Sequence, residues 1–225
     1  MIQIDAEHLK RIVGKCLREA IEQNELANQL SKQAKSFAKT NIEGLPLIYG
    51  CNYVPKDKGI EQTDLQKRTN EFVLCFKNDN NKFPSNKYQT VKANAINYYN
   101  KVLVKCFDDY INAITLLGVP CHDKKSNELR WKDVLNRLCG NRMANGYDHI
   151  TYKGETLPSH INKGHLSGLP DIEYDQNFFS GKVVVLIDDL FTTGSHIKKC
   201  KEQLEKCGAK VILAITLAKT LSKDK

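Results

Sequence analysis

The chain has 225 residues, a hydrophobic content of 41% and a formal net charge of +8. This length and content suffice for one sizeable hydrophobic core. No stretch approaches the ~18 consecutive apolar residues that a membrane span needs, and the start, MIQIDAEHLKR, lacks the pattern of a signal peptide. The sequence therefore predicts a cytoplasmic protein that has no membrane segment.

The eight cysteines are spread along the chain, and no two of them form a closely spaced pair. Zinc ribbons need pairs of the CxxC type, so this spacing argues against a zinc site. Most of the cysteines stand among apolar residues, as in FVLCF and VLVKCF. We interpret them as small buried hydrophobes of a protein in a reducing compartment.

The excess of basic residues has two interpretations. It describes either a solvated, lysine-rich surface or a surface that attracts phosphate groups, on a small ligand or on nucleic acid. The sequence contains no block of consecutive basic residues that resembles a DNA-binding arm. A nucleic-acid partner is therefore the more weakly supported of the two phosphate-bearing ligands.

The first half of the chain predicts mainly helix. Apolar residues in 5–38 recur with helical spacing, and the position of the apolar stripe shifts once along the segment. This pattern indicates one long helix or two in series. Residues 47–53 alternate weakly and favour a strand, and 55–70 are polar and rich in turn formers. NEFVLCFK is ambiguous between helix and strand, and residues 91–110 return to helical spacing.

From residue 112 the pattern changes to strands that alternate with helices. AITLLGVP is an apolar burst, CHDKKSNELR a polar loop, WKDVLNRLCG a short helix and DHITY a short strand. After a long polar connection, KVVVLIDD is the clearest strand, HIKKCKEQLEKCGA a helix and VILAITLAK a final strand. This alternation is typical of an α/β fold with a parallel sheet. The predicted segments are a helical extension over 1–44, a hood or linker of mixed structure over 45–111, and an α/β core over 112–225.

The segment VVVLIDDLFTTGSH, residues 183–196, carries the clearest chemistry. Its continuous aliphatic run is typical of a central parallel strand, and ligands of open α/β sheets bind at the carboxyl ends of strands, where Asp188 and Asp189 stand. A hydroxyl-rich turn follows and leads into a helix, whose N-terminus offers N–H groups to a phosphate. The turn comprises Thr192, Thr193, Gly194, Ser195 and His196.

Two carboxylates beside a phosphate cradle suit a ligand with a phosphate and vicinal hydroxyls, such as a sugar phosphate, together with hydrated Mg²⁺. The GxxxxGK[ST] pattern of a P-loop NTPase is absent. The acids are adjacent, whereas a haloacid-dehalogenase site needs them at i and i+2. The remaining alternative is a strand end with ordinary helix caps, but capping explains one Ser or Thr and not the whole segment.

The segment IDDLFTTGS after VVVL resembles the phosphoribosyl-pyrophosphate (PRPP) motif of type I phosphoribosyltransferases. His196 departs from that motif, because the family usually has a hydroxyl residue there. The stretch K-x-x-T-x-x-S before SGKVVVLIDD, and NEFVLCFKND upstream, are closest to the ComF-like branch, although the zinc ribbon of that branch is absent. The resemblance is good over 112–220 and weak over 45–80, and the first forty residues match nothing known to us.

The resemblance implies a type I phosphoribosyltransferase-like parallel sheet flanked by helices, with a mainly helical N-terminal extension. It implies that Asp188 and Asp189 are the catalytic carboxylates, which hold the ribose hydroxyls of PRPP and, through water, Mg²⁺. The 5-phosphate of PRPP would lie on residues 192–196. Two further loops are implied. The pyrophosphate loop contains Cys121, His122, Lys124 and Lys125, and the mobile loop contains Lys153, Thr156, Ser159 and His160.

The implied reaction is the Mg²⁺-dependent transfer of phosphoribosyl from PRPP to a nucleobase-type acceptor, with release of pyrophosphate. The alternative is a catalytically silent regulator that binds PRPP or a nucleotide, or a ComF-like accessory protein in nucleic-acid processing. His196 leaves both open, because its imidazole either donates a hydrogen bond to the phosphate or marks a weakened site. The sequence also leaves open a homodimer and a protein partner that binds the N-terminal helix.

Overall fold

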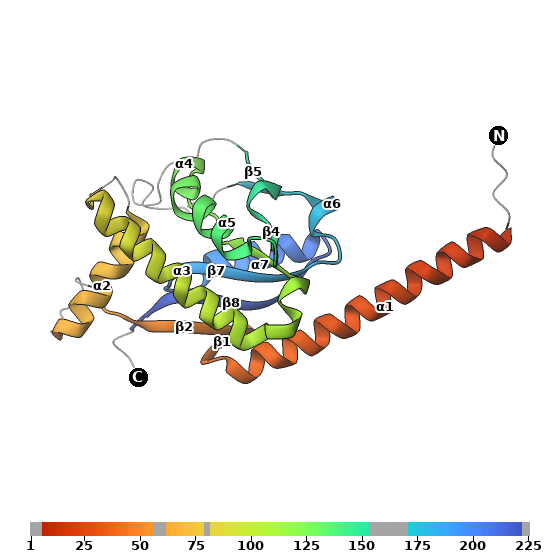
Figure 1. Ribbon diagram of the computed structural model, residues 1–225, viewed down its shortest axis with the longest axis horizontal. Coiled ribbons are helices and arrows are strands. Elements are labelled where there is room, and N and C mark those ends of the chain that lie inside the picture. Colours follow the sequence, from red (N-terminus) through yellow and green to blue (C-terminus); the bar gives the residue numbers. More distant parts are fainter. Residues whose placement is uncertain (1–5, 56–61, 79–81, 154–170, 222–225) are drawn as a thin grey trace.

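The computed structural model describes residues 6–55, 62–78, 82–153 and 171–221, and it has an α/β fold (Figure 1). A six-stranded, mainly parallel sheet of order β1-β2-β8-β7-β3-β4 forms the centre. β1 and β2 pair antiparallel, and the other neighbours pair parallel. The strands are β1 (Thr40–Ile42), β2 (Leu45–Tyr53), β3 (Ile114–Gly118), β4 (Ala144–Asn145), β7 (Val183–Phe191) and β8 (Lys210–Thr220).

A separate antiparallel pair, β5 (Ile150–Tyr152) and β6 (Ile172–Tyr174), stands beside this sheet. The N-terminal helix is continuous, which decides between one helix and two in series. The helices are α1 (Ala6–Phe37), α2 (Asp64–Lys77), α3 (Ser85–Phe107), α4 (Lys124–Asn127), α5 (Asp133–Cys139), α6 (Gln176–Phe179) and α7 (Ser195–Lys206).

The sheet is buried on both faces, as the aliphatic runs predict. On one face, Val185 and Ile187 of β7 join a core cluster with α3, α5 and the C-terminal part of α1. On the other face, Val184 and Leu186 join a second cluster with α7 and β6. Figure 1 shows the same layers, with α3 and α5 over one side of the sheet and α7 against the other.

The prediction of turns over 55–70 is wrong in its second half, because α2 begins at Asp64. Thr63 and Gln66 form a reciprocal capping box there, with the Gln66 N–H donating to Thr63 Oγ1 and the Thr63 N–H donating to the Gln66 side chain. Two backbone donors are thereby satisfied at the helix start. The helix includes NEFVLCFK, so that ambiguous segment is helical.

The prediction of a loop over CHDKKSNELR is also wrong for most of its length. Asp123 caps α4, and a π-helical turn (η4, Glu128–Lys132) joins α4 to α5. The side chain of Asp123 accepts hydrogen bonds from the Ser126 N–H at 2.7 Å and from the Ser126 hydroxyl at 2.6 Å. The polar composition of this segment therefore reflects an exposed helical face and not a loop.

The long polar connection before β7 contains β6 and α6 in its described part. At the other end of the sheet, β2 carries the segment after residue 45 into the centre, beside β8. The region that we predicted as hood or linker thus supplies one of the longer strands. Buried Asn70 of α2 fixes the end of β2, because its side chain exchanges hydrogen bonds with the N–H and carbonyl of Val54.

The cysteines in the described part of the chain confirm the interpretation as buried hydrophobes. Cys51 and Cys207 are partly buried, and Cys75, Cys106, Cys121, Cys139 and Cys200 are buried; the side chain of Cys16 lies outside the described residues. Burial raises the pKa of the Cys106 thiol to about 11 and that of Cys139 to about 12. Within the same described ranges, every helix is too short or too polar to traverse a lipid bilayer.

Candidate functional site at the carboxyl edge of the sheet

β3 and β7 place two predicted loops at the same edge of the sheet. The strands are parallel neighbours with Gly118 opposite Ile187, and the Val119 N–H donates to the Ile187 carbonyl at 2.8 Å. Because both chains run in the same direction, the loop after Gly118 and the turn after Phe191 leave from one edge. The structure therefore brings the predicted pyrophosphate loop and the predicted phosphate turn together.

The turn between β7 and α7 depends on Gly194. This residue has a φ of +80°, and a Cβ there would lie 2.7 Å from the Phe191 ring. Both facts favour glycine, because other residues are strained in the left-handed region. The hydroxyls of Thr193 and Ser195 lie 3.1 Å apart in the same turn. The turn and the end of β7 border a pocket lined by Asp188, Leu190, Phe191, Thr192, Gly194, Ser195, His196 and Ile197.

The pocket opens at the N-terminus of α7, a helix of 12 residues. Gly194 at the N-cap supplies no side-chain cap, and the Ser195 N–H donates to Thr193 Oγ1 only at 3.5 Å. The first N–H groups of a helix have no partner within the helix, and the helix dipole favours an anion there. Together with the exposed side chains of Thr192, Thr193 and Ser195, these groups make the pocket suitable for a phosphate.

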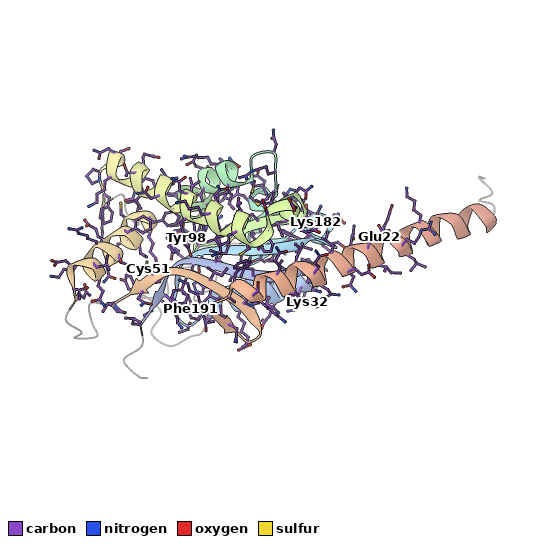
Figure 2. All side chains as sticks on the ribbon, turned by 60° about the horizontal axis from the view of Figure 1, so that its bottom comes forward. Glu22, Lys32, Cys51, Tyr98, Lys182 and Phe191 are labelled. Carbon is purple, nitrogen blue, oxygen red and sulfur yellow. The ribbon has the colours of Figure 1, made fainter. Side chains whose placement is uncertain are left out.

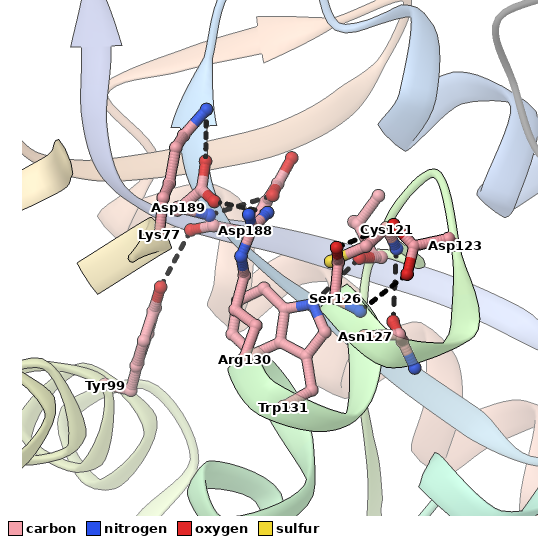
Figure 3. Close-up of polar contacts among 11 residues, drawn as sticks. Lys77, Tyr99, Cys121, Asp123, Ser126, Asn127, Arg130, Trp131, Asp188 and Asp189 are labelled. Carbon is pink, nitrogen blue, oxygen red and sulfur yellow. Dashed lines mark hydrogen bonds and ion pairs between the residues drawn. The ribbon is translucent and has the colours of Figure 1, made fainter. Parts of the chain in front are cut away.

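Asp188 lines this pocket and is only partly exposed. Its carboxylate accepts a hydrogen bond from the N–H of Asp189 at 2.8 Å, and its carbonyl accepts one from the Tyr99 hydroxyl at 2.8 Å (Figure 3). Burial, and then the neighbouring charge of Asp189, raise the pKa of Asp188. An ionised Asp188 is therefore a costly group that a hydroxyl-bearing ligand would stabilise.

Asp189 has a different environment, because two cations hold it. Its side chain is 3% exposed and lies 2.7 Å from Arg130 Nη1 and 3.4 Å from Lys77 Nζ. In turn, the charge of Asp189 raises the pKa of Lys77. Figure 3 shows Lys77 and Arg130 reaching this carboxylate from two different helical segments, α2 and η4. Asp189 thus joins three elements of the fold.

Sequence reasoning missed Lys77 and Arg130 as site residues. Both lie in segments that it assigned to an ambiguous element and to a loop, and both are far from Asp189 in sequence. The sequence carries only a partial signal, because alternation along β7 places the side chain of Asp189 on the same face of the sheet as that of Ile187. The structure adds that Ile187 packs in one cluster with Phe76 and Trp131, the chain neighbours of Lys77 and Arg130.

His196 lies at the start of α7 and lines the pocket. The residue is exposed, yet nearby protein atoms remove enough water from the imidazole that burial, followed by the charge of Lys77, lowers the pKa of His196. The charge of His122 contributes in the same direction. His196 also lines a pocket together with Val119 and Pro120, so the two loops lie close to each other.

The predicted pyrophosphate loop has a fixed shape. The Cys121 N–H donates to Asn127 Oδ1 at 3.1 Å, and the Cys121 carbonyl accepts a hydrogen bond from the Tyr152 hydroxyl at 3.0 Å. His122 Nε2 lies 2.6 Å from Asp123 Oδ2. The side chains of Lys124 and Lys125 are exposed in the first turn of α4. The loop thus presents two exposed ammonium groups on a rigid turn.

Trp131 is fully buried, as expected for a core residue. Its indole N–H donates to the Val119 carbonyl at 2.9 Å, and its ring lies where a Cβ on Gly118 would stand, 2.5 Å away. Trp131 therefore fixes the chain where β3 enters the predicted pyrophosphate loop.

Only one residue of the predicted mobile loop is described. Lys153 follows β5, has an exposed side chain and lies 3.0 Å from Glu173 of β6. Its N–H donates to the Asp171 carbonyl, so the β5–β6 pair extends to this point. Thr156, Ser159 and His160 lie outside the described residues, and their predicted roles stay predictions.

A second pocket adjoins the first along α7. Val119 and Pro120, the strand β6 and one side of α7 enclose it, and His196 borders both pockets. Its lining residues are Val119, Pro120, Asp171, Ile172, Tyr174, His196, Lys199, Cys200 and Gln203. Two neighbouring pockets that share His196 thus lie at the carboxyl edge of the sheet on the α7 side.

No protein-family model matches the chain, and no curated protein matches it.

The described residues do not gather three or more His, Cys, Asp or Glu side chains into a metal-binding group. Asp189 is engaged by two cations, which leaves Asp188 as the carboxylate that faces the pocket. Such a donor set does not form an all-protein cation site. It fits Mg²⁺ that arrives on a pyrophosphate, because that ion keeps most of its ligands as water and phosphate oxygens.

Proposed function

We propose that the protein binds PRPP at the carboxyl edge of the sheet and transfers its phosphoribosyl group to a nucleobase-type acceptor, with release of pyrophosphate. The observation that carries this proposal is the pocket at the start of α7. It combines a helix N-terminus, a hydroxyl-rich turn and Asp188, and through His196 it adjoins a second pocket that Val119 and Pro120, just before the Cys121–Lys125 loop, help to line. These groups match a ligand with a terminal phosphate, vicinal hydroxyls and a second anionic group.

The surroundings of the two aspartates suggest separate roles. Asp188 borders the pocket, so its carboxylate would accept hydrogen bonds from the ribose hydroxyls. Asp189 is occupied by Lys77 and Arg130, so in this proposal it positions the two cations beside the bound ligand. The 5-phosphate would lie on residues 192–196, and the pyrophosphate would face Lys124 and Lys125.

In the proposed reaction, the bond between C1 of the ribose and the pyrophosphate oxygen breaks, and the electron pair leaves with pyrophosphate. A ring nitrogen of the acceptor forms the new bond to C1. Positive charge develops on the ribose in between, and the carboxylate of Asp188 would stabilise it. The ammonium groups of Lys124 and Lys125 would stabilise the leaving group. Mg²⁺, bound with PRPP, would neutralise part of the pyrophosphate charge.

A second candidate is a catalytically silent protein that binds PRPP or a nucleotide as a regulator. His196 favours it, because burial lowers the pKa of the imidazole and leaves it neutral at pH 7. A neutral imidazole donates one hydrogen bond but adds no positive charge to the phosphate site. Binding without turnover would distinguish this candidate from the transferase.

The test is calorimetric titration of the full chain with PRPP and Mg²⁺, followed by an assay of pyrophosphate release with a panel of nucleobases. The transferase predicts both binding and release that depends on an acceptor. The regulator predicts binding alone. Asp188→Asn should weaken binding about 10-fold or more, since a hydrogen bond to a charged group is worth about 1.5–3 kcal/mol. No binding of PRPP by the wild-type chain would reject both candidates.

A further inference from the structure

The two aspartates of β7 lie past the point where β3 ends beside them. In the described sheet, β3 pairs with β7 only as far as Gly118 opposite Ile187. On the other side, β8 continues beside β7, with Thr216 opposite Asp188. A strand segment with a neighbour on one side only is held by fewer backbone hydrogen bonds. The position of Asp188 and Asp189 therefore depends on contacts from outside the sheet.

Helix α3 supplies one such contact through Tyr99. This side chain is fully buried, and its hydroxyl donates to the Asp188 carbonyl at 2.8 Å (Figure 3). Burial, and then the charges of Asp189 and Asp188, raise the pKa of Tyr99. The hydroxyl therefore keeps its proton and remains a donor. α3 thus holds the backbone of Asp188 from the face of the sheet that the helix covers.

The same helix also holds the π-helical turn η4, which carries Arg130. The carbonyl of Leu129 accepts hydrogen bonds from the Tyr88 hydroxyl at 2.9 Å and from Lys92 Nζ at 3.3 Å. Tyr88 and Lys92 are both buried, and residues four apart lie on the same side of a helix. π-Helical turns are rare and frequently lie at functional sites. This one brings Arg130 Nη1 to within 2.7 Å of Asp189.

Together these contacts form a closed circuit. It leads from α3 through η4 to the ion pair of Arg130 and Asp189, and from there through the backbone of Asp188 back to α3. Lys92 and Tyr99 are seven residues apart, so both ends of the circuit start from the same face of the helix. A single helix therefore sets where Asp188 stands relative to Arg130. We call this set the α3 circuit; its members are Tyr88, Lys92, Tyr99, Leu129, Arg130, Asp188 and Asp189.

We propose that α3 is the positioning element of the candidate site, with Tyr99 as the positioning residue for Asp188 and Tyr88 as the positioning residue for Arg130. Neither tyrosine touches the ligand in this arrangement, and each acts through the group that it holds. The inference rests on the proposed function, because it takes PRPP as the ligand that Asp188 contacts.

Tyr98 offers a matched control in the same helix. Its hydroxyl donates to the Thr216 carbonyl at 3.1 Å, and Thr216 lies opposite Asp188 on the neighbouring strand. Figure 2 shows Tyr98 on α3, where the helix lies over the sheet. Tyr98→Phe and Tyr99→Phe therefore each remove one hydroxyl that bonds a strand carbonyl at the same level of the sheet. Of the two tyrosines, Tyr99 alone bonds a residue that lines the pocket.

The first test is calorimetric titration of the full chain with PRPP and Mg²⁺. Tyr99→Phe should weaken PRPP binding about 5-fold, the size of one hydrogen bond that a displaced Asp188 no longer makes. Tyr88→Phe should weaken it in the same direction. Tyr98→Phe should stay within about 2-fold of the wild type. Urea unfolding should show similar losses of stability for Tyr98→Phe and Tyr99→Phe, so that the difference in affinity reports position and not general destabilisation.

The second test needs no ligand. In urea unfolding, Tyr99→Phe combined with Asp189→Asn should shift the midpoint by less than the sum of the two single shifts, because both changes open the α3 circuit. Tyr98→Phe combined with Asp189→Asn should shift it by the full sum. If Tyr99→Phe does not fold, Tyr88→Phe takes its place in both tests, at the other end of the circuit.

The outcomes separate this inference from the proposed function. Suppose that the wild type binds PRPP and that Tyr98→Phe and Tyr99→Phe bind it equally well. The positioning role of Tyr99 is then wrong, and the proposed function stands. A wild type that does not bind PRPP rejects the proposed function, and the double variants then decide on the circuit alone. Additive midpoints for Tyr99→Phe with Asp189→Asn would refute it, whatever ligand the site takes.

Discussion

Asp188 and Asp189 are neighbours in the chain but face different sides of the sheet, because successive side chains of a strand alternate. The side chain of Asp189 lies on the same face of the sheet as those of Val185 and Ile187. It therefore contacts Lys77 and Arg130, which come from the helices that cover that face. Asp188 turns to the side of α7 and borders the pocket. Because of the strand pleat, Asp189 forms ion pairs within the fold and Asp188 lines the candidate site.

Asp189→Asn tests whether the ion pairs of Asp189 stabilise the fold. The change removes the carboxylate that both Lys77 and Arg130 contact, and loss of one partner of a buried ion pair costs about 3–5 kcal/mol. We expect urea unfolding to show a loss near that range. The same change at exposed Asp109 is the control and should stay within about 0.5 kcal/mol. An unaltered midpoint for Asp189→Asn would mean that the ion pairs do not stabilise the fold.

Asp188→Asn tests the pH dependence that follows from a buried carboxyl. Since burial raises the pKa of Asp188, the folded chain binds this proton more tightly than the unfolded chain does. The contribution of this group to the free energy of unfolding is therefore fully present below the usual pKa of aspartate. It is lost as the pH rises through the pKa that Asp188 has in the folded chain. Asp188→Asn should be more stable than wild type at pH 7, and the difference should shrink near pH 4, as thermal melts at both values can establish.

His196→Thr separates the two interpretations of the departure from the motif. Because burial lowers the pKa of His196, its positive charge appears only below the usual range of histidine. PRPP affinity in the wild type should therefore rise as the pH falls below about 6.5, and the variant should show only the change due to the titration of the phosphate itself. Tighter binding in the variant at pH 7 would identify a weakened site, whereas equal or weaker binding would identify a working imidazole donor.

At the scale of elements, the turn between β7 and α7 is the most constrained part of the site. Its backbone has to reverse direction within a few residues and still present N–H groups to the pocket. Gly194 makes this possible, and the ring of Phe191 occupies the space that a side chain would take. The conformation of the hydroxyl-rich turn and the packing of β7 against α7 therefore depend on each other.

Gly194→Ala should destabilise the protein and weaken phosphate binding together. The left-handed φ and the contact of 2.7 Å with Phe191 both oppose a methyl group, at a combined cost of about 2–4 kcal/mol. Gly140→Ala is the matched control, because Gly140 also has a positive φ but has no atoms within 4 Å of a Cβ. If the two variants lost equal stability, the close approach to Phe191 would contribute nothing.

At the scale of the whole molecule, the central sheet joins segments from the two ends of the chain. β2 pairs parallel with β8, with Leu47 opposite Ala214 and Tyr53 opposite Thr220. The candidate site therefore stands on a sheet that is complete only when distant segments have come together.

Much of the fold follows from local patterns in the sequence. The aliphatic runs predict β3, β7 and β8 because burial on both faces leaves no polar position in such strands. Helical spacing predicts α1, α3 and α7 in the same way. The α2 start and the helical turns after Cys121 were missed, because their caps involve polar residues that are equally common in loops. β6 and α6 were missed for the same reason.

The sequence by itself determined the α/β class and the hydroxyl-rich turn after β7, because both depend on residues that are close together in the chain. It predicted Asp188 and Asp189 as a pair of equal carboxylates. Only the tertiary structure decided that Asp189 is neutralised by Lys77 and Arg130, while Asp188 borders the pocket. The physical reason is that ion pairs are set by which helices cover which face of the sheet, and that arrangement depends on packing between distant segments.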